Sequence, residues 1–112
     1  MSSHLFLKQV KQVLESRVSI SLEKREGIHD FHYYIFFPNG YGISVFYFDY
    51  YAALELAVLK GNKESFQLDY TTPITDDILR TDDIEEFIQI LQDVSNLEAN
   101  LYDELKNMYD RV

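Results

Sequence analysis

Two clusters of acidic residues are the groups in this 112-residue sequence whose spacing suggests a chemical role. One is Asp76-Asp77, and the other contains Asp82, Asp83, Glu85 and Glu86 at the start of an amphipathic stretch. Acids in a first helical turn are stabilised by the positive end of the helix dipole, which is one interpretation. Alternatively, they form a negative surface that enters a basic groove and imitates a nucleic-acid backbone. The spacing does not match a calcium-binding loop, so we expect no metal here.

The histidines and the possible nucleophiles suggest less chemistry than the acidic clusters do. His29 and His32 lie three residues apart, and strand residues at that spacing point to opposite faces, so we expect no shared metal ion. The sequence has no Gly-x-Ser-x-Gly motif and no phosphate-binding glycine loop. We therefore expect no cofactor and no enzyme. A small hydrolase is the third hypothesis, because nineteen acidic residues offer many carboxylate pairs.

Tyrosines are the second candidate for recognition. Five of them are expected to gather on one face of an aromatic hairpin and the loop that follows it: Tyr34, Tyr41, Tyr47, Tyr50 and Tyr51. They either complete the core or form a patch that binds a partner, because tyrosine offers a large contact area at low entropic cost. The candidate partner-binding residues are therefore the six acidic residues of the two clusters and three tyrosines, Tyr47, Tyr50 and Tyr51.

The element that must position these residues is a β-hairpin over 31–48. Two aromatic and β-branched runs flank Asn39-Gly40, the dipeptide that favours a tight two-residue turn. That turn would set Phe36 opposite Ile43 and place Phe31, Phe46 and other rings on one face. Both faces would then be apolar, so helices must cover one and further protein or a partner must meet the other.

The remaining segments predict a single α+β domain over 1–112. We expect an amphipathic helix over 3–17, a strand over 18–22, and a second hairpin with arms 54–60 and 63–70 about Gly61-Asn62. A helical turn over 76–79 and a helix from Asp82, capped by Thr81, follow. That helix either continues to 111 or restarts near Ser95. The expected architecture is an antiparallel meander of about five strands with the helices packed on one face.

Charge and composition limit the partners. The net charge is −9, and residues 72–112 contain eleven acids against three bases, so direct nucleic-acid binding is disfavoured and a basic protein partner is allowed. The absence of cysteine excludes disulfides and thiol chemistry. No segment approaches the roughly 20 apolar residues of a membrane span. We expect a soluble protein of the bacterial cytoplasm with no membrane contact.

Residues 41–92 resemble small phage- and prophage-encoded proteins of unassigned function. The resemblance lies in a Tyr-Gly-x-Ser-Val strand at 41–45, a Glu-Leu-Ala-Val-Leu strand at 55–59 and the segment Thr-Pro-Ile-Thr-Asp-Asp at 72–77. It departs at 49–53, where the pattern has a glycine-rich loop. The resemblance implies a viral origin and brings no established activity or site residues.

These observations favour a non-enzymatic protein of a phage or other mobile element that binds and blocks a host or defence protein. Anti-CRISPR and anti-restriction proteins are the class analogy, with the acidic clusters as a nucleic-acid mimic. The alternative is a phage structural or housekeeping module that acts as a homodimer through the aromatic face or the C-terminal helix.

Overall fold

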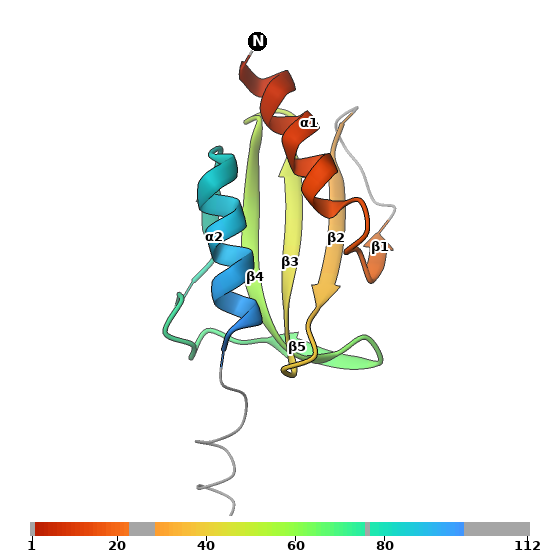
Figure 1. Ribbon diagram of the computed structural model, residues 1–112, viewed down its shortest axis with the longest axis vertical. Helices are drawn as coiled ribbons and strands as arrows, with labels where there is room; N and C mark the ends of the chain where they lie inside the picture. The colour runs from red at the N-terminus through yellow and green to blue at the C-terminus, as the bar shows by residue number, and fades with distance from the viewer. Residues whose placement is uncertain (1, 23–28, 76, 98–112) are drawn as a thin grey trace, which may run out of the picture.

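The computed structural model describes residues 2–22, 29–75 and 77–97 as one curled antiparallel sheet with two helices on one face (Figure 1). This confirms the expected α+β architecture. The elements in chain order are α1 (Ser2–Leu14), β1 (Ile20–Leu22), β2 (Phe31–Phe36), β3 (Tyr41–Phe48), β4 (Ala53–Asn62), β5 (Ser65–Leu68), β6 (Leu79–Thr81) and α2 (Ile84–Ser95).

The strands form a meander in the order β1-β2-β3-β4-β5, which curls into a half-barrel. β4 has ten residues, long enough to pair with two short strands along its outer edge. Its first part pairs with β6, with Leu54 opposite Thr81, and its last part pairs with β5, with Leu59 opposite Leu68. β4 therefore pairs with the strand before and the strand after the connection over 69–78.

The first hairpin differs from the prediction by one residue. Phe36 lies opposite Gly42, and the backbone N–H of Phe37 donates to the carbonyl of Tyr41 at 2.8 Å. The loop therefore has three residues, Pro38, Asn39 and Gly40, and Gly40 takes a φ of 85°. A three-residue loop whose last residue is left-handed is the next most common hairpin connection after the two-residue turn.

That one-residue shift exchanges the two faces of β3, because successive strand residues point to opposite sides. Ile43, Val45 and Tyr47 lie on the helix-covered face with Phe31 and Ile35. The predicted grouping of Phe46 and Phe48 with Phe31 is therefore wrong. The fully buried residues of the core come from both helices and three strands: Val10, Leu14, Ile35, Ile43, Val45, Tyr47, Leu54, Leu56, Val58, Phe87 and Val94.

The second hairpin turns two residues later than predicted, at Lys63-Glu64. The Oδ1 atom of Asn62 accepts hydrogen bonds from the backbone N–H groups of Glu64 at 2.9 Å and Ser65 at 3.1 Å, which stabilises the turn there. Gly61 stays within β4 at a φ of 128°, where an added Cβ would lie 2.2 Å from the carbonyl oxygen of Ser65.

The segment before the second helix also differs. A helical turn was expected over 76–79, but residues 77 and 78 are not helical and residues 79–81 form β6, which pairs with the outer edge of β4. α2 begins after Asp83, whose carboxylate accepts the backbone N–H of Glu85 at 2.9 Å, so Asp83 and not Thr81 is the N-cap. Residue 76 and the expected helical continuation over 98–111 lie outside the described residues.

α1 is shorter at its C-terminal end than the helix expected over 3–17, and α2 ends at Ser95, near the position where the sequence allowed a restart. α1 ends at Leu14, followed by a turn over 15–17. α2 places Phe87 and Val94 in the core at 0% exposure and ends at Ser95, with Asn96 as its C-cap. Neither helix in the described part of the chain has the length and apolar character needed to cross a membrane.

Candidate functional site

Six of the described residues singled out in the sequence lie at one end of the molecule, which we call the acidic-tyrosine end. It consists of Tyr50, Tyr51, Asp82, Asp83, Glu85 and Glu86. The loop between β3 and β4 carries the two tyrosines, and α2 begins with the acids. Because Thr81 pairs with Leu54 at the start of β4, the beginning of α2 lies beside that loop (Figure 1).

The tyrosines of this end are unusually exposed for large side chains. Tyr50 is 90% and Tyr51 57% exposed, and their rings meet edge to face with centroids 4.9 Å apart. The guanidinium of Arg80 lies 4.8 Å from the centre of the Tyr51 ring and also binds the carboxylate of Glu55 at 2.5 Å. Arg80 therefore holds Tyr51 in place while Tyr50 faces solvent.

The four acids are all exposed, and one has a structural role. Asp83 caps α2, whereas Asp82, Glu85 and Glu86 form no ion pair with any residue in the described part of the chain. Glu85 and Glu86 lie in the first turn, where the helix dipole stabilises negative charge. The cluster combines helix capping with carboxylates that are free to meet a partner.

Two candidate residues lie elsewhere, and a third is outside the described residues. Tyr47 is 1% exposed in the core, where its ring stacks on Phe31 at 5.5 Å, so it is not part of an exposed patch. The one-residue shift of the first hairpin explains this difference. Asp77 precedes β6, whose whole length separates it from Asp82. Asp76 lies outside the described residues. The expected face of five tyrosines therefore does not form.

The face of the sheet opposite the helices forms a groove with a volume of about 410 Å³. The curl of the sheet brings Phe66 of β5 against Tyr34 of β2, with ring centroids 4.9 Å apart, and against Phe36 at 5.0 Å. The small side chains of Ser44 and Ala57, which pair across β3 and β4, leave the space between these rings open. The groove accounts for part of the second apolar face.

The two histidines lie on opposite sides of the sheet, although His29 is in the turn before β2 and not in a strand. The Nε2 atom of His32 lies 2.7 Å from the hydroxyl of Ser44 in the groove, and burial lowers the pKa of His32. His29 lies before β2 on the α1 side. Within 2–22, 29–75 and 77–97, no three acidic or histidine side chains are grouped so that they could hold a metal ion.

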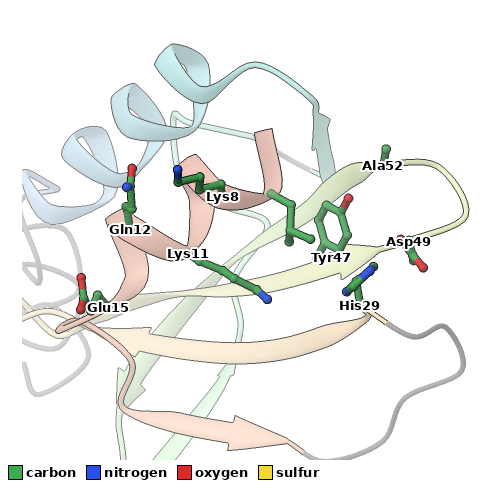
Figure 2. A pocket seen from close by; sticks show the side chains of 9 residues that line it. Lys8, Lys11, Gln12, Glu15, His29, Tyr47, Asp49 and Ala52 are labelled. Atoms are coloured by element: carbon green, nitrogen blue, oxygen red, sulfur yellow. The ribbon is translucent and has the colours of Figure 1, made fainter. Parts of the chain in front are cut away.

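A larger pocket, the α1 pocket, opens between α1 and the upper ends of β3 and β4 and has a volume of about 600 Å³ (Figure 2). Lys8 and Lys11 line it from α1, His29 and Asp49 line it from the facing side, and Tyr47 lies between them. This pocket was not predicted from the sequence. Two lysines one helical turn apart in an acidic chain were the signal that could have indicated an anion-binding surface.

The α1 pocket bears on the hydrolase hypothesis. Of the two carboxylates that line it, Glu15 lies at one end and Asp49 at the other (Figure 2). A glycosidase-type mechanism needs two carboxylates facing one bond from about 5 to 9.5 Å apart. Figure 2 shows Glu15 and Asp49 at opposite ends of the pocket, and the hydrolase stays a hypothesis.

Comparison with known protein families, curated proteins and solved structures finds no match for this chain. The role of the acidic-tyrosine end, the groove and the α1 pocket must therefore be argued from their own chemistry. The resemblance of residues 41–92 to phage-encoded proteins stays a hypothesis.

Proposed function

We propose that this chain is a non-enzymatic protein of a phage or other mobile element that binds and inhibits a host or defence protein. The contact is the acidic-tyrosine end. The observation that supports it most is the position of Tyr50, 90% exposed, on the loop beside the start of α2, where Asp82, Glu85 and Glu86 are also exposed. Exposed tyrosines frequently anchor protein interfaces, and clustered charge steers and orients a partner of opposite sign.

The partner expected from this chemistry has a basic surface. A net charge of −9 repels nucleic acid, whereas a protein that binds nucleic acid carries lysines and arginines that would accept these carboxylates in place of phosphates. Inhibition by occupying such a groove is the mode of acidic nucleic-acid mimics, so an anti-CRISPR or anti-restriction role in the bacterial cytoplasm is the specific form of this proposal.

A pair of charge-reversed variants tests the contact. In one variant, Glu85 and Glu86 are replaced by lysine. In the control, lysine replaces Glu15 in the turn after α1 and Glu64 in the β4–β5 turn, both of which are exposed. Both variants raise the net charge by four, and Asp83 is kept because it caps α2. The immobilised protein captures its partner from bacterial lysate, and the captured protein is identified. We expect the first variant to lose capture and the control to keep it.

The fold must be checked in parallel, since lysine at a helix start opposes the dipole and costs some tenths to about 1 kcal/mol for each residue. Circular dichroism and thermal unfolding provide that check. A further variant, Tyr50→Ala, removes a side chain that is already surrounded by solvent. It should weaken capture without affecting the fold. Equal capture by both charge-reversed variants at low salt would refute the acidic contact.

A second candidate function is a homodimeric phage structural or housekeeping module. Its support is the apolar rim of the groove, where Leu68 is 52%, Tyr70 39% and Ile78 48% exposed. Exposed side chains of this kind on one face are typical of association surfaces. Size exclusion with light scattering separates the two candidates: a dimer that Leu68→Glu dissociates favours this one, and a monomer at high concentration counts against it.

A further inference from the structure

The α1 pocket concentrates positive charge in an otherwise acidic chain. Lys8 and Lys11 lie one helical turn apart on α1 and both line the pocket, and neither forms an ion pair with a residue that the structure describes. Figure 2 shows the Lys11 side chain extending toward His29 and Tyr47. The carboxylates of Glu15 and Asp49 lie at the two ends, so an anion would be drawn to the middle, next to Lys11.

The α1 pocket also has apolar surface, which Leu7, Ala52 and the ring of Tyr47 provide. The Tyr47 ring stacks on Phe31, with ring centroids 5.5 Å apart. Burial, with the nearby charges of Asp49 and then Asp30, raises the pKa of Tyr47. Its hydroxyl therefore stays protonated at neutral pH and can donate a hydrogen bond to a ligand.

We propose that the α1 pocket binds a small organic anion with an apolar body. The anionic group, a carboxylate, sulfonate or phosphate, lies against Lys11, and the apolar body packs on the ring of Tyr47. The volume of about 600 Å³ falls within the roughly 300–1,000 Å³ of small-molecule sites, which combine apolar walls with a few polar groups. This site is independent of partner capture by the acidic-tyrosine end.

Two fluorescent probes with the same ring system test the proposal. The first is 1-anilinonaphthalene-8-sulfonate, which has a sulfonate group, and the second is the neutral N-phenyl-1-naphthylamine. Each is titrated into the full chain, Lys11→Glu and the control Lys63→Glu, an exposed lysine in the β4–β5 turn. We expect Lys11→Glu to weaken the sulfonate probe about tenfold or more, since a charge-assisted contact is replaced by repulsion. The control should bind it as the natural sequence does.

Two further measurements distinguish the α1 pocket from the groove: the affinity for the neutral probe and the position at which the sulfonate probe binds. Lys11→Glu should change the affinity for the neutral probe by less than about twofold, because the apolar contacts are kept. Amide shifts in a ¹H–¹⁵N spectrum should change at Lys8, Lys11 and Ala52 on addition of the sulfonate probe. Shifts confined to Ser44 and Ala57 in the groove, equal affinity in Lys11→Glu and Lys63→Glu, or no binding at millimolar probe would overturn the proposal.

Discussion

Replacing Asn39 should uncouple the first hairpin from the C-terminal end of α2. The side-chain amide of Asn39 donates hydrogen bonds to the carbonyls of Val94 at 2.8 Å and Leu97 at 3.0 Å, and its Oδ1 accepts the backbone N–H of Tyr41 at 3.1 Å. The last carbonyls of a helix have no donor within the helix, so this loop residue provides a cap from 55 positions away in the chain.

The three hydrogen bonds set the size of the effect. A typical bond contributes about 0.5–1.5 kcal/mol net, and these groups are only partly buried, so Asn39→Ala should lower the free energy of unfolding by about 2–3 kcal/mol. Asn39→Asp keeps the acceptor but loses both donors at neutral pH. It also places a negative charge at the negative end of α2, which costs about 0.3–1 kcal/mol.

The aspartate variant should therefore depend on pH in a way that alanine does not. The helix end disfavours the ionised carboxylate, so the pKa of the new aspartate is raised on folding and the penalty is present at neutral pH. The penalty is lost as pH falls below about 4, because the protonated carboxyl carries no charge and can donate one hydrogen bond. Urea denaturation followed by circular dichroism at pH 7 and pH 3.5 measures both effects.

Asn62→Ala in the second hairpin is the matched control. Asn62 also accepts backbone hydrogen bonds in a turn, from Glu64 and Ser65, but it contacts no helix end. Its replacement should cost about 1 kcal/mol and show no such pH dependence. The reasoning is refuted if Asn39→Ala costs no more than Asn62→Ala, or if the deficit of Asn39→Asp is the same at both pH values.

Two further predictions concern the sheet. Gly42→Ala should lower stability by about 1–3 kcal/mol in urea denaturation, because the added Cβ would lie 2.5 Å from the carbonyl oxygen of Ile35; unchanged stability would contradict it. Acidification should lower the melting temperature as pH falls below about 6.5, because burial lowers the pKa of His32 and the unfolded chain binds the proton more readily. His32→Gln should reduce this dependence, whereas His29→Gln, at an exposed position, should leave it intact.

The sequence predicted the central elements because their apolar patterns are strong. The aromatic and β-branched run of β3 beside Asn39-Gly40 and the three- and four-residue spacing of Phe87, Leu91 and Val94 identify a strand and a helix without tertiary information. The acidic residues after Thr81 likewise indicated where α2 begins, to within two residues. The acidic half of the candidate interaction surface followed from that alone.

Short and edge elements could not be predicted in the same way. β6 has three residues, too few for a period to show, and it forms because the outer edge of β4 is open to pairing there. The turn of the second hairpin was misplaced because Gly61-Asn62 satisfies the rules for a two-residue loop. In the structure the side chain of Asn62 instead caps a turn over the next two residues.

The remaining differences have one cause, the loop length of the first hairpin. Both faces of β3 are apolar, so hydrophobicity cannot choose between a two-residue and a three-residue loop. The observed register buries Ile43 and Val45 at 0% exposure beneath the helices and turns the small Gly42 and Ser44 to the open face. This one choice buries Tyr47 beside the α1 pocket and leaves room for the groove. The two unpredicted cavities therefore depend on a loop whose Asn39 is held by α2, which is why the helix and hairpin must be tested together.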